Sequence, residues 1–162
     1  MAYDRCDSYQ GSSTRFRSGR RQPRYGTYKR GLNSKVHLAV AKNGLPVGCI
    51  VTAGTIGDCT KAVDLLQGLI ADTLFADRAY DTNEIIEYAK TRNMEIVIPP
   101  KKNRVVQREY NKELYKLRHL VENAILKVKR WRGIATRYAK HTASFLASVC
   151  ACCVFLWAKY LV

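Results

Sequence analysis

Four polar residues recur at helical spacing in the segment YKLRHLVENAILKVK, namely Tyr115, Arg118, Glu122 and Lys129. An α-helix has about 3.6 residues per turn, so steps of three, four and seven residues return to nearly the same side. The four residues therefore share one stripe, and the opposite side, which can face a core, carries Leu117, Val121, Ala124 and Val128. The simplest interpretation is a solvated surface with an Arg118–Glu122 ion pair, worth about 0.2–0.5 kcal/mol.

A second acid, Asp77, ends the short apolar run TLFAD, which is typical of a buried strand. In open α/β sheets, sites form outside the carboxyl ends of the strands. Carboxylate oxygens are hard ligands that favour Mg²⁺ or Mn²⁺ over Zn²⁺, and two such ions about 3.5–4 Å apart can clamp the attacking and leaving oxygens of a phosphodiester. The alternative for Asp77 is a turn or helix-capping acid. The sequence shows no Ser–His pair, P-loop or cysteine–histidine zinc set that would indicate a competing chemistry.

The elements that must position these residues follow a mixed α/β pattern. KVHLAVAK and VGCIVTAG flank the turn signal NGLP and predict a hairpin, and EIVIPP, like TLFAD, predicts a buried strand. DCTKAVDLLQGL and TNEIIEYAKTRN predict helices, the first capped by Asp58 or Thr60 and the second by Thr82 or Asp81. A long helix is expected from about Leu114 to Arg130. The order of elements predicts an α/β layer structure.

The composition indicates a polyanion-binding globule. The 162 residues include 28 Lys and Arg against 13 Asp and Glu, a formal net charge of +15, which attracts nucleic acids or anionic membranes. Residues 1–34 are basic and show no periodicity, so we expect a flexible arm there and one domain over residues 35–162. That arm is either a solvated tail or a segment that orders on DNA phosphates, and its basic residues include Arg20, Arg21 and Arg24.

Two features of the sequence concern its surroundings in the cell. The six cysteines lack the pairing of a metal site and are interpreted as small apolar residues of a reducing compartment. The apolar terminus HTASFLASVCACCVFLWAKYLV is expected to form a helix packed against the protein. The alternative is a membrane anchor, although the uncharged stretch is shorter than a bilayer span of about 20 residues.

The stripe resembles the Y-x2-R-x3-E-x6-K signature of bacterial insertion-sequence transposases of the DDE type, and all four letters match. ADRAYD looks like the segment that holds the second catalytic aspartate of that family, which falls on Asp77. Further blocks look like family sequence in the family's order: KRGLNSKVHLAV, TAGTIGDCTKA, VIPPKKNR, YNKELYKLRHLVEN and RWRGIATRYAKHTASFLA. The resemblance covers about residues 29–158.

The resemblance implies a ribonuclease-H-like fold, a mixed sheet flanked by helices, with DNA cleavage and strand transfer as its activity. Asp77 and Glu122 would be catalytic residues and metal ligands for two Mg²⁺ or Mn²⁺ ions. DNA contacts would come from Tyr115, Arg118 and Lys129, joined by the basic residues Arg78, Lys101, Lys102, Arg104, Arg20, Arg21 and Arg24. Expected partners are the double-stranded DNA of transposon ends and target, and a second copy of the chain on DNA. A bacterial cytoplasmic, nucleoid-associated location is expected, without a membrane.

The sequence departs from the family at its amino-terminal end. The family's first catalytic aspartate lies on an opening strand, and residues 1–26 show no apolar run of that kind. Asp7 is the candidate for this acid and Asp4 a weaker one, while Ser12–Thr14 resembles the family triplet without its acid. The chain is therefore expected to be a truncated copy, or one half of a split reading frame whose partner fragment supplies the missing acid. The alternative function is a DNA-binding remnant without catalysis.

Overall fold

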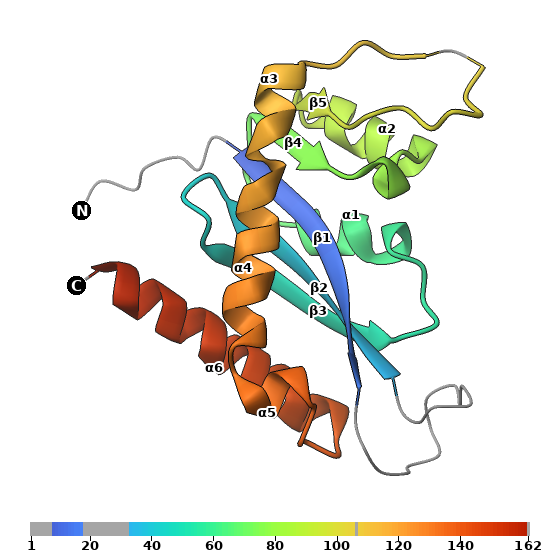
Figure 1. Cartoon of the computed structure of the whole chain (residues 1–162). Coiled ribbons are helices and arrows are strands. Elements are labelled where there is room, and N and C mark those ends of the chain that lie inside the picture. Colours follow the sequence, from blue (N-terminus) through green and yellow to red (C-terminus); the bar gives the residue numbers. More distant parts are fainter. Residues whose placement is uncertain (1–7, 18–32, 106, 162) are drawn as a thin grey trace.

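The computed structural model describes residues 8–17, 33–105 and 107–161, with side chains from residue 34 onward. Its centre is a five-stranded sheet in the order β3-β2-β1-β4-β5 (Figure 1). The strands are β1 (Ser8–Arg17), β2 (Asn33–Ala41), β3 (Pro46–Ala53), β4 (Thr73–Ala76) and β5 (Glu95–Val97). The hairpin and both buried strands expected from the sequence are confirmed.

The middle strand corrects one expectation. Residues 1–34 were predicted to be an arm, yet Ser8–Arg17 forms β1, which pairs antiparallel with β2 and parallel with β4. Serine, glycine and arginine give this strand no apolar pattern, so periodicity did not reveal it. Its backbone pairs on both sides, and this tertiary pairing outweighs a weak local preference.

Helices cover both faces of the sheet (Figure 1). One face carries α4 (His119–Lys129), α5 (Arg132–Ala135) and α6 (Thr142–Leu161), which pack on the apolar side chains of β2 and β3. The other face carries α1 (Ala62–Leu66), preceded by η1 (Cys59–Lys61), and α2 (Asn83–Thr91). The mixed α/β layers are therefore confirmed. Of the proposed caps, Thr82 accepts a hydrogen bond from the Ile85 N–H at 3.4 Å, whereas Asp58 makes no capping bond.

The expected long helix is three successive pieces: α3 (Lys112–Tyr115), η3 (Lys116–Arg118) and α4. Asn111 caps the first, because its side chain accepts from the N–H groups of Glu113 and Leu114. The short 3-10 segment η3 tightens the turn where the helix passes β4. In α4 the inward side consists of Val121, Ala124, Ile125 and Val128, all buried. The periodicity predicted three of these residues; it did not predict Ile125, and the fourth predicted residue, Leu117, is half-buried in η3.

The terminal helix α6 packs through one side only. Phe145, Val149 and Cys152 are fully buried, while Val154, Phe155, Tyr160 and Leu161 are exposed. By length and composition this helix could cross a membrane, since its mean hydropathy over 18 residues is 1.7 and 17% of those residues are buried inside the protein. Cys49 on β3 lies against it, with its Sγ 3.6 Å from that of Cys150, and every cysteine in the described part of the chain is a free thiol. A hydrogen bond with Cys153, together with burial, raises the pKa of the Cys49 thiol, so this thiol stays protonated and packs as a small apolar group.

Candidate active site

The stripe on the long helix meets the carboxyl end of β4 at Arg118. Its Nη1 lies 2.5 Å from Oδ1 of Asp77, and its Nη2 lies 3.0 Å from Oε1 of Glu122. One guanidinium therefore holds both acids, which are 45 residues apart in the chain. Asp77 is in place because β4 ends at Ala76, and Glu122 because it lies one helical turn after Arg118. The structure thus brings together the two carboxylates that the sequence singled out.

Tyr115 completes this cluster. Its hydroxyl donates to Oδ1 of Asp77 at 3.2 Å, and its ring stacks under the Arg118 guanidinium at 5.7 Å. Burial, with the nearby Asp77 charge, raises the pKa of Tyr115, so the phenol stays protonated. The hydrogen bond to Asp77 raises the pKa of Arg118 against the opposing effect of burial. The cluster therefore consists of two carboxylates, one permanent cation and one neutral donor.

The two carboxylates suit a hard divalent cation. Their side chains are 40% and 51% exposed, so oxygen lone pairs remain accessible from solvent. Mg²⁺ commonly binds one or two carboxylates and completes its shell with water and substrate phosphates. Among the side chains that the structure describes, no group of three or more His, Cys, Asp or Glu is placed to hold an ion. The donors therefore fit one ion, and a second ion requires a further ligand.

The strand beside Asp77 does not supply that ligand at the neighbouring position. The register of β1 on β4 pairs Gly11 with Ala76. The residue that follows Gly11 is Ser12, and the residue that follows Ala76 is Asp77. Serine has no carboxylate. Asp7, the acid predicted from the sequence, lies outside the described residues.

A hollow of about 350 Å³ opens beside Asp77. It is lined by Asp77, Arg78, Ala79, Pro99, Tyr110 and Tyr115. The rings of Tyr110 and Tyr115 meet edge to face with centroids 5.6 Å apart, so the hollow combines aromatic walls with a cation and an acid. Arg78, a predicted DNA contact, is exposed at this place.

The other predicted DNA contacts differ in their surroundings. Lys102 and Lys129 are exposed and Lys101 half-buried, whereas Arg104 bonds through Nε to Oδ2 of Asp81 at 2.6 Å. Arg104 is thus engaged in an ion pair within the protein, and no pattern in the sequence predicts that ion pair. The predicted contacts Arg20, Arg21 and Arg24 lie outside the described residues.

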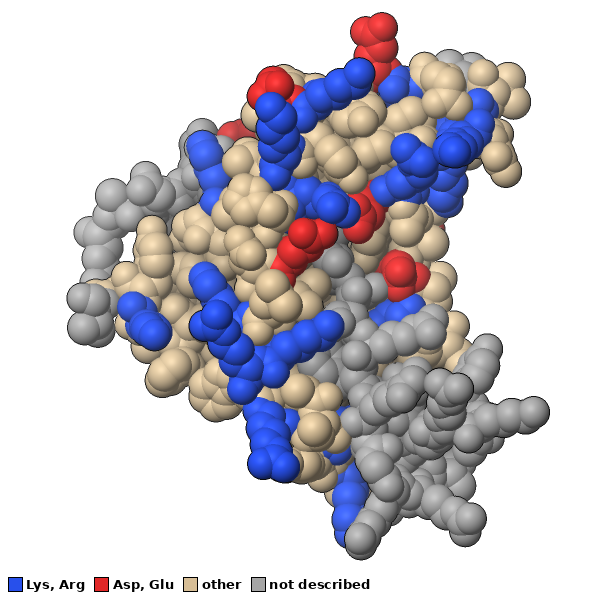
Figure 2. All heavy atoms as spheres, in the orientation of Figure 1, with Lys and Arg blue, Asp and Glu red and all other residues tan. Residues whose placement is uncertain are grey.

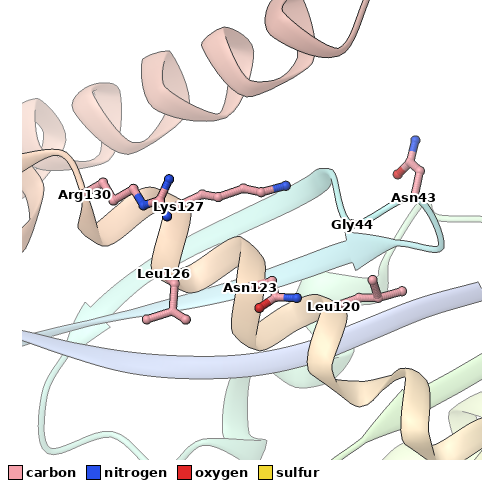
Figure 3. Close-up of a pocket in the computed structure, with 7 residues that line it drawn as sticks. All are labelled: Asn43, Gly44, Leu120, Asn123, Leu126, Lys127 and Arg130. Carbon is pink, nitrogen blue, oxygen red and sulfur yellow. The ribbon is translucent and has the colours of Figure 1, made fainter.

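Cations extend from this site along the face that carries α4, with a few acids among them near the centre (Figure 2). A second hollow, of about 220 Å³, lies between α4 and the turn after β2 (Figure 3). Its lining contains two cations and no acid: Asn43, Gly44, Leu120, Asn123, Leu126, Lys127 and Arg130. The sequence analysis did not single out Lys127 or Arg130, although Lys127 lies on the same helix as Lys129 and Arg130 directly follows that helix.

Comparison with known proteins agrees with this geometry. The family model described as "Transposase DDE domain" matches residues 9–157. A Brucella ovis protein named as the transposase for insertion sequence element IS6501 is 32% identical over 132 residues, covering 79% of this chain and all of that protein. A Burkholderia cepacia protein named for insertion sequence element IS402 is 26% identical, and the match covers 76% of this chain and 63% of that protein.

The fold also resembles solved structures at low sequence identity. The catalytic core domain of BIV integrase has a TM-score of 0.55 at 13% identity, with 92% of this chain and 82% of that chain covered. A chain of the simian T-cell lymphotropic virus intasome gives the same TM-score and identity, with coverage of 89% and 47%. The ribonuclease-H-like fold expected from the sequence is therefore confirmed. With the family match over nearly its whole length, the chain belongs to the DDE transposases of insertion sequences.

Proposed function

We propose that this chain cleaves DNA at the ends of an insertion sequence and joins the freed 3′ ends to target DNA. The observation that carries the proposal is the convergence of Asp77 and Glu122 on one guanidinium at the carboxyl end of β4. Two exposed carboxylates at that place form a ligand pair for a divalent cation, within a face rich in cations that suits DNA phosphates. Water is the nucleophile for cleavage, and the 3′-hydroxyl is the nucleophile for strand transfer.

Asp77 and Glu122 would hold Mg²⁺ or Mn²⁺, and two ions are proposed on the strength of the family. When bound, such ions lower the pKa of the attacking water or hydroxyl and neutralise the charge that develops on the phosphate. With a divalent cation held by Asp77 and Glu122, Arg118 would no longer be needed to neutralise the two carboxylates. The guanidinium is then available to donate two parallel hydrogen bonds to a phosphate. Tyr115 supplies a neutral donor beside it, and Lys129 supplies a cation 11 residues after Arg118, about 16 Å further along the helix at about 1.5 Å per residue.

The partners proposed for this chain are double-stranded DNA, at the transposon ends and at the target, and a second copy of the chain bound to the same DNA. A partner fragment from a split reading frame is proposed as the source of a further acid. The proposed place of action is the bacterial nucleoid.

The test compares Mg²⁺-dependent nicking of DNA that carries the element's ends by the native protein and by Glu122→Gln. Glu113→Gln is the matched control, because it removes the same charge from an exposed position on α3. We expect the native protein and the control to nick, and Glu122→Gln to lose at least 100-fold in rate, of the order seen when a key transition-state stabiliser is removed. Equal nicking by Glu122→Gln would show that the site is wrongly assigned.

The second candidate function is DNA binding without cleavage. The serine at the strand position beside Asp77 favours it, because the carboxylate set is then one acid short. It predicts salt-dependent binding with little dependence on sequence, since phosphate contacts require only the cations. Strand transfer by this chain alone would exclude it.

A further inference from the structure

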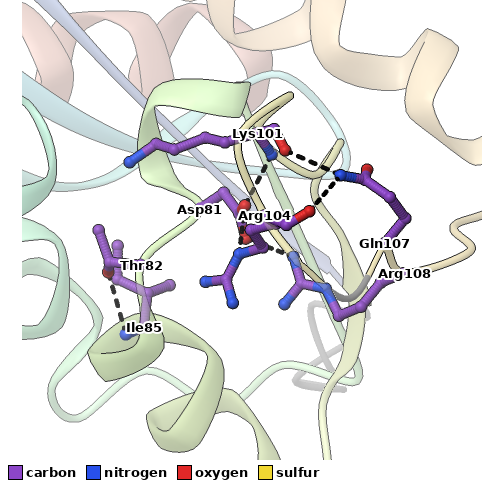
Figure 4. Close-up of polar contacts among 7 residues, drawn as sticks. All are labelled: Asp81, Thr82, Ile85, Lys101, Arg104, Gln107 and Arg108. Atoms are coloured by element: carbon purple, nitrogen blue, oxygen red, sulfur yellow. Dashed lines mark hydrogen bonds and ion pairs between the residues drawn. The ribbon is translucent and has the colours of Figure 1, made fainter.

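Asp81 is an acid buried inside a basic loop. Its side chain has no exposed surface, and it accepts three hydrogen bonds from that loop (Figure 4). The backbone N–H of Lys101 lies 2.8 Å from Oδ2, Arg104 Nε lies 2.6 Å from the same oxygen, and Arg108 Nη2 lies 2.5 Å from Oδ1. The proposed chemistry does not involve Asp81. The sequence suggested Thr82 or Asp81 as the cap of α2, and in the structure the cap is Thr82.

The loop closes on itself around that acid. Gln107 Nε2 donates to the carbonyl oxygens of Lys101 and Arg104, at 3.2 and 2.9 Å, and the Arg104 N–H donates to the Lys101 carbonyl at 3.1 Å (Figure 4). Lys102, Asn103 and Val105 are exposed, so the described residues of the loop are held mainly by these bonds. Its conformation therefore depends on the bonds to Asp81.

The ends of the loop reach the candidate active site. Pro99 precedes it and Tyr110 follows it, and both line the hollow that contains Asp77. Asp81 itself follows Asp77 by four residues, at the end of the short helix η2 (Arg78–Tyr80). An anchor at Asp81 therefore fixes the loop relative to the catalytic acid.

The arginines of the loop are occupied by this contact. The side chains of Arg104 and Arg108 are only 26% and 25% exposed, because they turn inward to the carboxylate. The side chain of Lys102, by contrast, is exposed to solvent. Arg104 and Arg108 are therefore internal anchors of the loop, whereas Lys102 is a cation that can reach a ligand.

We propose that Asp81 is a positioning residue for DNA binding, which holds the loop over residues 101–108 so that Lys101 and Lys102 meet a DNA strand entering the hollow beside Asp77. The inference rests on the proposed function in taking DNA as the ligand. Arg104 and Arg108 act as anchors of the loop and do not bind phosphate.

The ionised state of Asp81 supports this arrangement. Burial alone would raise the pKa of Asp81, but the hydrogen bonds from Lys101 and Arg104 and the charges of both arginines outweigh it, so its pKa is lowered. The buried acid is thus a carboxylate at neutral pH. If the carboxylate is removed, two guanidinium groups face each other without a counter-ion, and the loop opens.

The experiment separates two effects that change DNA affinity in opposite directions, namely the net charge of the chain and the position of the loop. Asp81→Asn and Asp72→Asn each add one unit of positive charge, and Asp72 is exposed. If net charge decided DNA affinity, both variants would bind as tightly as the native chain or more tightly. We expect Asp72→Asn to do so, and Asp81→Asn to bind duplex DNA about tenfold more weakly, since the phosphate contacts of the loop are lost.

Two further measurements keep the test independent of cleavage. Trypsin should cut within residues 101–108 many times faster in Asp81→Asn, while the circular dichroism of the variant stays native. Lys102→Gln should weaken DNA binding while the loop stays protected, and it should have no added effect in the Asp81→Asn background. Native or tighter DNA binding by Asp81→Asn with an uncut loop would overturn the proposal. None of these readouts requires that the chain nick DNA, so failure of the proposed catalysis would be recognised separately.

Discussion

Arg118 and Asp77 are separated by 41 residues, yet their side chains meet at 2.5 Å where the long helix passes the end of β4. The same guanidinium reaches Glu122, so one cation occupies the position between two acids. This contact holds the two acids together, and it would compete for their oxygens with the metal ion proposed above.

Arg118→Ala is expected to bind Mn²⁺ more tightly than the native chain, because the cation that competes for both carboxylates is gone. DNA binding by the same variant should weaken several-fold, since a donor for phosphate is also lost. Titration calorimetry with Mn²⁺, with Lys116→Ala as control, measures the first effect. Unchanged or weaker Mn²⁺ binding would contradict the competition.

Ser12→Asp is expected to raise the affinity for Mn²⁺, because a third carboxylate would then stand beside Asp77 on the neighbouring strand. Ser13→Asp, one position further along β1, is the control and should change Mn²⁺ affinity little. If Asp7 supplies the acid instead, Asp7→Asn will lower the affinity and Ser12→Asp will have no effect. Calorimetry distinguishes the two results without any measurement of cleavage.

Lys127→Gln and Arg130→Gln together should weaken duplex binding and make it less sensitive to salt. Each lost phosphate contact reduces the slope of log K against log salt by about 0.9, so the double variant should lose about 1.8. Lys90→Gln, an exposed cation on α2 outside the hollow of Figure 3, is the control. Binding isotherms at four or five salt concentrations measure the slope. An unaltered slope would mean that DNA does not contact this hollow.

His37 should make the folded state sensitive to mild acid. The residue is 1% exposed on β2 and its Nε2 lies 2.9 Å from Thr52 Oγ1. Burial, together with the charge of Lys35, lowers the pKa of His37 below its ordinary value of 6.5. Its neutral form stabilises the fold above that value, and the contribution is lost as the pH falls toward the folded-state pKa.

The corresponding measurement is urea unfolding at several pH values between 5 and 8. The free energy of unfolding of the native chain should fall as the pH is lowered through 6.5. His37→Gln should show a smaller change with pH, and His141→Gln, at an exposed position, should behave as the native chain does. An equal pH dependence in His37→Gln would assign the effect to other groups.

Two phenylalanines on α6 should differ sharply in their effect on stability. Phe145→Ala, at a fully buried position, is expected to cost about 3–5 kcal/mol of unfolding free energy. Phe155→Ala should cost about 1 kcal/mol or less, because that ring is 52% exposed and its recorded aromatic contact is the edge of Trp131. Denaturant unfolding of both variants measures the difference. Similar costs would mean that the exposed side of α6 is covered in solution.

The sequence by itself determined the parts of this protein that depend on local periodicity. The alternation in KVHLAVAK predicts a strand and the apolar run before Asp77 a buried strand, and both are confirmed, with β2 buried on both of its faces. The spacing in the long helix predicts that Val121, Ala124 and Val128 face the core, and these three residues are buried. The stripe of polar residues on the long helix could be predicted for the same reason, because helical geometry alone sets which residues share a side.

Only the tertiary structure decided which distant groups meet. β1 has no apolar pattern of its own, and its position depends on pairing with β2 and β4. The contact of Arg118 with Asp77, the burial of Asp81 among two arginines, and the serine in register beside Asp77 all depend on how separate elements pack. The physical reason is that burial, charge pairing and strand register arise between segments far apart in the chain, whereas the order of residues within a segment specifies only that segment's own surface.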